Sequence, residues 1–383
     1  MNKSQAWASS SPRLVLVIGS LQGGGAERQF SEMANYWAQC GVRVTLVTCS
    51  GREAEDFYPL HGAVERVRLE VRPSRSKLLT RILASPLRIL RLRRLLRESR
   101  PDAVVSFIDV TNIYSILAAS GLGVRVVVAE RTHPAVNRGL SWPWRALRRL
   151  LYRRAAVVVA QTRDAAEWLK RHGAAHVAVI PNALRKLPQL QGERETLILA
   201  VGRLSREKGF DLLLQAFAQL RLDFPRWRLC LVGEGSERGA LLQLCEALQL
   251  VDCVEFVGEV RRVEPWLARA GLLVHPSRRE GFPNVVLEAM GMGVAVVCAD
   301  CRAGPSELIT DGSNGRLVPV DDLAALVRVM SELMADPAAR ARLGREACKV
   351  REPFAQEQIM QRWQACVLPA GARRAVPAES RFP

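Results

Sequence analysis

Two glutamates eight positions apart, Glu280 and Glu288, flank a short Gly-Phe-Pro-Asn segment in the second half of the chain. The glycine-led turn runs into a predicted helix, which places Glu280 in the loop and Glu288 in the helix. Glu280 and the amides of Gly281 and Phe282 can then face a sugar and its phosphates, while the carboxylate of Glu288 can accept two ribose hydroxyls. Two glutamates at this spacing also occur by chance in most long chains, so the spacing alone assigns no function.

A second polar segment, Gly202 to Gly209, carries Arg203 and Lys208 between a predicted strand and a predicted helix. Open α/β sheets bind ligands at the carboxyl ends of their strands. Arg203 offers a fixed fork of donors and Lys208 a point charge beside a helix N-terminus, and each charge-assisted hydrogen bond contributes about 1.5–3 kcal/mol. We expect both cations to bind phosphate; the alternative is that they are two solvated surface cations.

The first half of the chain contains a glycine loop, Gly23 to Gly25, before a predicted helix over residues 26–40. Glycine lets the backbone approach a ligand closely, although a plain turn is an equal alternative at this point. A dinucleotide-binding loop would require an acidic residue about twenty positions further on, at the end of the second strand. Residues 48–50 are Thr, Cys and Ser, so NAD binding is disfavoured.

Arg131 and His133 follow a predicted strand that ends at Ala129, again at a carboxyl end. This position makes both side chains candidates for a site at the edge of the first sheet. A histidine at a strand end is more often structural than catalytic, and that alternative stays open.

Short β-branched runs alternate with helical patterns along the chain, which predicts parallel α/β sheets. Because 383 residues exceed what one core usually serves, two domains are expected. We predict an α/β fold with an N-terminal domain over residues 11–183, a C-terminal domain over 193–352, and a last helix over 353–369 that crosses back to the first domain. The predicted strands are 14–18, 43–48, 104–107, 124–129 and 156–160, then 197–201, 228–232, 254–257, 272–275 and 294–298.

The composition, with 49% hydrophobic and 24% charged residues, is that of an ordinary globular protein. No apolar run approaches the ~18 residues of a membrane span, and the opening segment is unlike a signal peptide, so we expect a cytoplasmic protein. The nine cysteines are scattered, which predicts free thiols. Cys298 and Cys301 lack the further ligands of a zinc site, and we expect no metal and no cofactor.

The formal charge of +17 predicts a polyanionic partner. Arginines and leucines alternate between Arg81 and Arg97, and from Pro86 onward the pattern predicts a basic amphipathic helix that binds an anionic membrane surface. A second patch between Trp142 and Arg154 adds interfacial aromatics, Tyr152 among them. The alternative is that the apolar sides are core and the arginines simply solvated.

Several of these segments together resemble the retaining glycosyltransferases of family four, which have the GT-B fold of two facing Rossmann-like domains with a cleft between them. The resemblance covers most of the second half through four segments, and the first half more loosely through residues 23–28. The four segments are 202–208, the Val-Gly-Glu-Gly turn at 232–235, Phe-Val-Gly at 256–258, and 276–290.

The resemblance implies a role for each candidate residue. Arg203 and Lys208 would bind the donor diphosphate, Glu288 the ribose, Glu280 the transferred sugar, and the backbone near Val257 and Gly258 the base. His133 would stand beside the donor sugar with Arg131 next to it. In the glycine loop, Gly24 and Gly25 would approach the donor phosphates or the acceptor.

The sequence departs from many relatives at Pro283, which replaces a second glycine and supplies no N–H; Asn284 could substitute. The Glu-Gly-Phe-Pro-Asn form resembles a subgroup that builds bacterial surface polysaccharides such as lipopolysaccharide, often from UDP-sugars. No D-x-D pair occurs, so the cations rather than a metal must neutralise the diphosphate. The resemblance therefore implies a metal-independent hexosyltransferase that moves a hexose or N-acetylhexosamine.

The basic patches lie in the half that receives the acceptor in this family, which favours a lipid-linked or glycan acceptor at the inner face of the cell membrane. A sugar-nucleotide epimerase or phosphorylase of the same architecture is the nearer alternative. A nucleic-acid-binding protein is a weaker one, because aromatic residues make up only 6% and no binding motif is recognisable.

Overall fold

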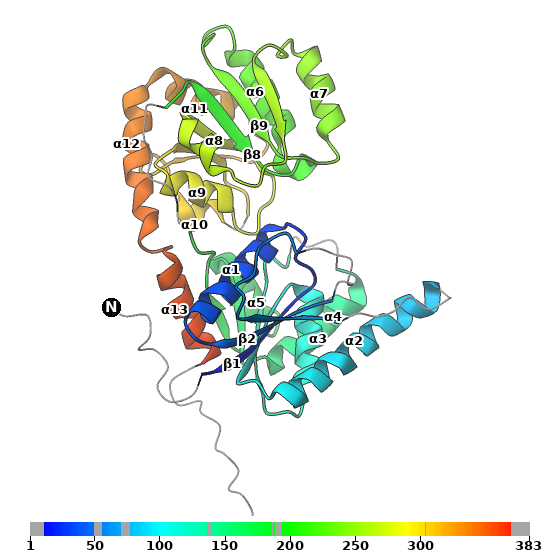
Figure 1. Cartoon of the computed structure of the whole chain (residues 1–383). Helices are drawn as coiled ribbons and strands as arrows, with labels where there is room; N and C mark the ends of the chain where they lie inside the picture. The colour runs from blue at the N-terminus through cyan, green and yellow to red at the C-terminus, as the bar shows by residue number, and fades with distance from the viewer. Residues whose placement is uncertain are drawn as a thin grey trace, which may run out of the picture. The chain divides into compact units, whose positions relative to one another are not determined.

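The computed structural model of the chain describes residues 11–49, 56–69, 77–135, 140–185, 187, 194–302 and 304–368 (Figure 1). For residues 77–83 it describes the backbone only. The chain forms two compact units. The first unit comprises Met1–Ile180 and Met360–Pro383, and the second comprises Pro181–Ile359.

The first unit is built on a parallel sheet of seven strands in the order β3-β2-β1-β4-β5-β6-β7. Val15 of β1 pairs with Thr45 of β2 on one side and with Val104 of β4 on the other. The direction of the chain along the sheet therefore reverses between β1 and β4, where the loops after the two strands separate. The strands are β1 (Arg13–Ile18), β2 (Arg43–Thr48), β3 (Val64–Arg68), β4 (Ala103–Phe107), β5 (Arg125–Ala129), β6 (Val157–Ala160) and β7 (Val177–Val179).

Helices cover both faces of this sheet. The face that includes Val15, Val104 and Val128 packs on α2, α3 and α5 in one buried cluster. On the opposite face, the ring of Phe107 contacts Phe30 of α1, with centroids 4.4 Å apart, and Trp363 of α13 (Gln356–Val367) at 5.6 Å. The helices of this part of the chain are α1 (Gly25–Gln39), α2 (Lys77–Ser99), α3 (Asp109–Ala119), α4 (Trp142–Leu151), η1 (Tyr152–Arg154) and α5 (Arg163–Arg171).

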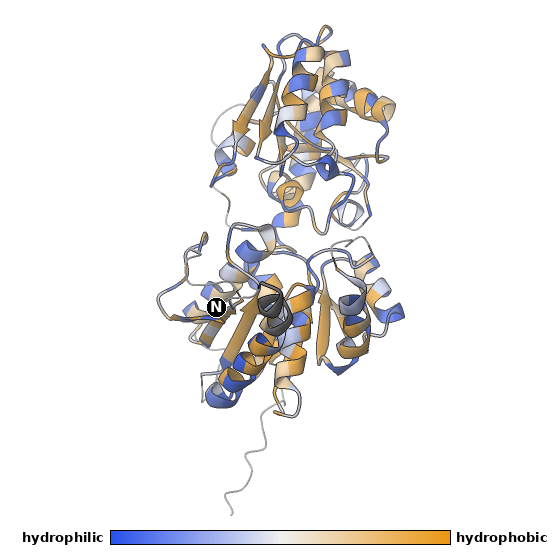
Figure 2. Ribbon diagram, turned by 90° about the vertical axis from the view of Figure 1, so that its right-hand side faces the viewer, coloured by the Kyte–Doolittle hydropathy of each residue, from blue (hydrophilic) through white to orange (hydrophobic). Residues whose placement is uncertain are grey.

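The second unit is built on a parallel sheet of six strands in the order β10-β9-β8-β11-β12-β13. Ile198 of β8 pairs with Leu229 of β9 and with Leu272 of β11, so the chain reverses its direction along the sheet between β8 and β11. The strands are β8 (Leu197–Val201), β9 (Arg228–Val232), β10 (Val254–Gly258), β11 (Leu272–His275), β12 (Ala295–Ala299) and β13 (Arg316–Val318). Apolar residues dominate the strands of both sheets (Figure 2).

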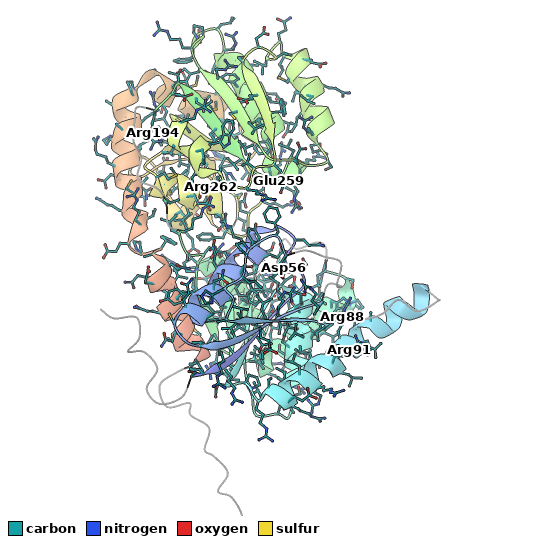
Figure 3. The ribbon with its side chains drawn as sticks, in the orientation of Figure 1. Asp56, Arg88, Arg91, Arg194, Glu259 and Arg262 are labelled. Carbon is teal, nitrogen blue, oxygen red and sulfur yellow. The ribbon has the colours of Figure 1, made fainter. Side chains whose placement is uncertain are left out.

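One face of the second sheet packs on α6, α7 and α11, and the other packs on α8, α9 and α10. Arg194, labelled in Figure 3, ties the ends of α8 and α9 together, because its guanidinium donates to the carbonyls of Leu267, Ala270 and Met292. The helices are η2 (Arg206–Lys208), α6 (Phe210–Leu220), α7 (Arg238–Ala247), α8 (Glu264–Arg269), α9 (Asn284–Gly291), α10 (Pro305–Leu308), α11 (Leu323–Ala335), α12 (Pro337–Ala347), η3 (Cys348–Arg351) and α13 (Gln356–Val367).

The structure corrects two expectations about the basic segments. Helix α2 begins at Lys77 and includes Pro86, rather than starting at the proline. It tolerates the lost backbone hydrogen bond because Leu92 and Leu96 are buried downstream and the hydroxyl of Ser85 is hydrogen-bonded to that of Tyr114 at 2.7 Å. Tyr152 is 2% exposed and belongs to the core, so it is not an interfacial aromatic.

The strands β3, β7 and β13 were not predicted, whereas the ten predicted strands all form with ends within one or two residues of the expected ones. All nine cysteines are free. None of the helices within the described ranges is both long and apolar enough to span a membrane.

Candidate functional site

A cluster of polar side chains in the second unit lies where its sheet reverses direction. Lys208 follows β8 and Glu280 follows β11, the two strands at the reversal. The ammonium of Lys208 lies 2.5 Å from Glu280 Oε1, and His275 Nε2, at the end of β11, lies 2.6 Å from the same oxygen. The sequence motifs predicted Lys208 and Glu280, and the structure brings them into direct contact.

The charge of Glu280 is fixed by its two neighbours. Burial alone would raise the pKa of this carboxyl, but the charges of Lys208 and His275 and their hydrogen bonds lower it to about 2. The side chain of Glu280 is 8% exposed and that of Lys208 is 23% exposed. Glu280 is therefore an ionised acceptor at neutral pH, held in place by two donors.

Glycines allow the loops beside Lys208 to pack closely. Gly233 has a φ of 141°, and a Cβ there would collide with the carbonyl oxygen of Gly202. Gly209, with a φ of 69°, lies against the carbonyl of Pro276 in the same way. Arg203, between these turns, is exposed and makes no ion pair with any described residue. It lies just after β8, at the carboxyl edge of the sheet, where a phosphate can reach an exposed side chain.

Glu288 lies in α9 and is 4% exposed. Its Oε2 is 3.2 Å from Nη2 of Arg185, and Nη1 of the same arginine is 3.3 Å from Glu264 Oε1. One guanidinium thus bridges two buried carboxylates. Sequence reasoning missed Arg185 and Glu264, because both stand outside the recognised segments and 185 falls in a stretch assigned to a linker.

The turn before α9 is held by side chains as well as by backbone. The ring of Phe282 is buried and lies 6.3 Å from that of Phe354, so Phe282 anchors the turn while Gly281 remains partly exposed. Asn284 is the first residue of α9, and its Oδ1 accepts a hydrogen bond of 2.6 Å from Asn182. Pro283 has no N–H, and the N–H of Asn284 donates to the carbonyl of Phe282 at 3.0 Å, so this amide is already paired within the turn.

The end of β10 contributes the backbone that sequence reasoning assigned to the base. Val257 and Gly258 are half-buried, and the carbonyl of Gly258 accepts the N–H of Gly233 at 2.8 Å. The strand ends in a residue with a φ of 84°, a conformation that favours glycine.

In the first unit, the glycine loop after β1 is organised by Glu27. Its Oε2 accepts the N–H of Gly24 and its Oε1 accepts the hydroxyl of Ser20, both at 2.5 Å. A Cβ at Gly24 would meet this carboxylate, so a larger residue there would displace the side chain of Glu27. Gly25 is the first residue of α1, so the loop opens directly into the N-terminus of a helix.

Arg131 and His133 follow β5, and both are fixed by neighbours. His133 is buried; its Nδ1 accepts the N–H of Ala135 at 3.1 Å, which leaves the proton on Nε2, 3.0 Å from Asp164 Oδ2. The guanidinium of Arg131 lies over the ring of Phe107, 4.3 Å from its centroid. Burial lowers the pKa of Arg131 to about 9, and the group still carries its charge at neutral pH.

Beneath these two residues the first unit contains a buried polar network that the sequence did not reveal. Arg148 donates to Asp109 at 2.7 Å and lies 3.7 Å from Glu130, while the hydroxyl of Tyr152 donates to Glu130 at 2.6 Å. The amide of Asn112 donates to the same hydroxyl at 2.9 Å. Burial and the neighbouring Asp109 raise the pKa of Glu130 well above its ordinary value.

Two family matches cover most of the chain. Residues 24–183 match the family described as glycosyl transferase 4-like domain, and residues 186–350 match that described as glycosyl transferases group 1. The chain belongs to the family-four glycosyltransferases. This glycosyltransferase has the GT-B fold, with two parallel-sheet α/β domains, and it is a hexosyltransferase enzyme.

Relatives and a solved structure agree with the assignment. The glycosyltransferase is 28% identical over 361 residues to a Campylobacter jejuni enzyme named GalNAc-alpha-(1->4)-GalNAc-alpha-(1->3)-diNAcBac-PP-undecaprenol alpha-1,4-N-acetyl-D-galactosaminyltransferase, covering 92% of this chain and 97% of that protein. It is 34% identical over 236 residues to an exopolysaccharide phosphotransferase of Streptomyces coelicolor, which covers 60% of this chain but only 25% of that protein. Anabaena Alr3699/HepE in complex with UDP superposes with a TM-score of 0.76 at 20% identity, covering 92% of this chain and 98% of that one.

Within the described parts of this glycosyltransferase, no group of three or more His, Cys, Asp or Glu residues is arranged to hold a metal ion. His275 is a third residue that sequence reasoning missed. It was assigned to the end of a strand, and the signal that could have found it is its spacing of five residues from Glu280.

Proposed function

We propose that this glycosyltransferase moves a hexose or N-acetylhexosamine from a UDP-sugar to a lipid-linked saccharide acceptor, with retention at the anomeric carbon and without a metal, in bacterial surface polysaccharide synthesis. The observation that carries the proposal is the cluster of Lys208, Glu280 and His275 at the reversal point of the second sheet. Ligands of open α/β sheets bind at such points.

The donor site follows from the charges around this cluster. Arg203 and Lys208 supply two cations for the diphosphate, and the amides of Gly281 and Phe282 lie in the turn that leads into α9. The ionised carboxylate of Glu280 suits the hydroxyls of the transferred sugar, and Glu288 suits the ribose. Uridine is proposed as the base because the Anabaena neighbour was solved with UDP.

Retention is proposed through departure of the diphosphate from the same face that the acceptor hydroxyl attacks. Negative charge then develops on the leaving phosphate oxygens, and Arg203 and Lys208 are fixed cations that stabilise it. Glu280 neutralises part of the positive charge that develops on the sugar ring, since it stays ionised at neutral pH. Arg131 and His133 of the first unit are proposed to contact the sugar, with Asp164 holding the imidazole in one tautomer.

The acceptor is proposed to be held at an anionic membrane surface. The relative from Campylobacter jejuni acts on an undecaprenol-linked saccharide, as its name states. In the present chain the first unit carries 32 Lys and Arg against 14 Asp and Glu, a net charge of +18, whereas the second carries 23 against 24, a net charge of −1. The positive charge is therefore confined to the unit proposed to receive the acceptor.

Helix α2 provides the surface for this contact. Leu92 and Leu96 face the core, whereas Leu87 and Leu90 are 38% and 61% exposed. The exposed residues recur at helical spacing together with exposed arginines, which gives an apolar and basic stripe suited to lipid headgroups. The arginines of the stripe are Arg91, Arg94 and Arg97; the side chain of Arg81 lies outside the described residues. Figure 3 labels Arg88 and Arg91 on this helix.

Nucleotide binding tests the donor site directly. Thermal unfolding with UDP, GDP, ADP and NAD in turn should show a shift with UDP alone, because a ligand that binds only the native state stabilises it by about 2.7 kcal/mol at a hundredfold excess over Kd. Glu288→Ala and Lys208→Ala should lose both this shift and sugar transfer while remaining folded. Glu246→Ala, an exposed glutamate of α7, serves as the control.

Three outcomes would count against the proposal. A shift with NAD but not UDP would indicate another enzyme class, and near-normal transfer by either variant would remove that residue from the site. Turnover of a sugar nucleotide in the absence of any glycan acceptor would favour an epimerase or phosphorylase.

A further inference from the structure

We propose that Arg185 and Glu264 are positioning residues for Glu288, and that this trio makes donor binding depend on the ribose diol. The inference rests on the proposed donor site, and it adds to it two residues that belong to none of the recognised segments. The single guanidinium of Arg185 lies between the carboxylates of Glu264 and Glu288, 3.3 and 3.2 Å away.

The burial of Glu264 is the first argument. Its side chain is 9% exposed, and Arg185 is the partner of its Oε1. Its other oxygen, Oε2, is buried and has no hydrogen-bond partner among the described residues. An unsatisfied buried oxygen is costly and is not expected in a merely structural ion pair. Arg185 is thus the charge partner of a buried carboxylate, and this pair ties the guanidinium to the start of α8.

The orientation of Glu288 is the second argument. A carboxylate that binds two adjacent hydroxyls must present a fixed edge, because each hydrogen bond is directional. Arg185 fixes one of its oxygens, Oε2, at 3.2 Å, and Glu264 fixes Arg185 from the other side. Without the guanidinium, two buried carboxylates would face each other, and their repulsion would turn Glu288 away.

The elements that supply the trio also place it at the nucleoside. Glu264 is the first residue of α8, six positions after Gly258 at the end of β10, and Glu288 lies in the second turn of α9. Both helices cover the same face of the sheet. The trio thus connects the segment proposed for the base with the residue proposed for the ribose.

The test compares UDP, 2′-deoxy-UDP, 3′-deoxy-UDP and inorganic diphosphate by calorimetric titration. The wild type should bind UDP at least roughly tenfold more tightly than either deoxynucleotide, as expected for a hydrogen bond to a charged acceptor. In Arg185→Met this preference should fall to less than about threefold, whereas the affinity for diphosphate, which depends on Arg203 and Lys208, should be unchanged. Glu264→Gln should weaken the preference less, because the amide oxygen can still accept from Arg185.

A double variant keeps the test decisive if Arg185→Met fails to fold. Arg185→Met with Glu264→Gln removes the repulsion between the two carboxylates, so it should fold, and the ribose preference should still be lost because the donor that fixes Glu288 Oε2 is gone. Arg316→Met is the matched control, since Arg316 also bridges two carboxylates, those of Asp311 and Glu332, on the far strand β13. It should leave all four affinities unchanged.

The outcomes separate this inference from the proposed function. If the wild type bound neither UDP nor diphosphate, the donor site itself would be wrong. If it bound UDP with a clear ribose preference and the Arg185 variants kept that preference, the positioning role would be overturned while the donor site stood.

Discussion

The two units have sheets of the same topology, yet the polar groups at the carboxyl ends of the corresponding strands are arranged differently. In each sheet the chain reverses direction beside the first strand of the unit, between β1 and β4 in one and between β8 and β11 in the other. In the second unit this edge carries Lys208, Glu280 and an exposed Arg203. In the first unit the polar groups at the ends of β4 and β5 are buried and bonded to one another.

The difference shows that topology determines where a ligand can bind but not which edge is equipped to bind it. If the ammonium of Lys208, which is 23% exposed, turns to a phosphate, the carboxylate of Glu280 keeps a second donor in His275. Arg148 cannot leave Asp109 in the same way, because it would leave a buried carboxylate without its cation. The first unit is rigid at this edge, and the second is chemically adaptable.

Breaking the network of the first unit should have the largest effect on stability. Arg148→Met removes the partner of Asp109, whose side chain is 6% exposed, and breaking a buried pair typically costs about 3–5 kcal/mol. Urea unfolding followed by circular dichroism should show this loss in the transition of the first unit. Arg94→Met, which removes the exposed pair with Glu98, should leave the stability almost unchanged. Equal losses in the two variants would mean that the buried network is no more important than a surface pair.

The ion pair between Lys208 and Glu280 in the second unit should make the free energy of unfolding depend on pH. The pKa of Glu280 is about 2, below its ordinary value of 4.5, so its contribution to stability is fully present above pH 4.5 and lost as the pH falls toward 2. Lys208→Met raises this pKa and should cost about 1–2 kcal/mol at pH 7 but almost nothing near pH 2.

Denaturant unfolding of both proteins between pH 2 and 7 measures that difference. Lys349→Met, which removes an exposed pair with Glu346, is the matched control and should show no such dependence. A difference between wild type and Lys208→Met that stays constant with pH would contradict the ionic origin of the effect.

The smallest effect is expected for the substitution of a single exposed arginine on the positively charged first unit, measured as a change in membrane binding. Arg91→Gln on α2 should weaken binding to vesicles containing phosphatidylglycerol by about 1 kcal/mol, roughly fivefold, because a basic residue near an anionic surface contributes about that much. Sedimentation with vesicles measures the change. Arg328→Gln, on the surface of the second unit, should have no effect; equal losses would indicate that binding follows total charge rather than the stripe of α2.

The predictable part of the fold was its buried centre. Central strands of parallel sheets are continuous apolar runs, so their positions can be found from the sequence. The missed strands β3, β7 and β13 lie at sheet edges and are short or rich in charge, as in the Val-Glu-Arg-Val-Arg run of β3. Their existence depends on pairing with a neighbour, which a local pattern does not record.

The residues of the candidate site also fall into a group that can be predicted from the sequence and a group that cannot. Lys208 and Glu280 lie in segments whose local sequence has a recognisable form. Arg185 reaches Glu288 across 103 positions, and Arg148 reaches Asp109 across 39. Contacts of this kind arise only when helices and strands pack together, and a single sequence contains no signal for them.

Helix α13 determines the order in which the two units can complete their folding. The helix begins in the second unit and ends in the first, where Trp363 lies against Phe107 and the carbonyl of Cys366 accepts a hydrogen bond from Arg125. During synthesis the first unit emerges from the ribosome early, but the side of Phe107 that packs against Trp363 remains uncovered until residues 360–367 have been translated. The unit that is made first is therefore the one that is completed last, and the second unit can finish its core in the interval.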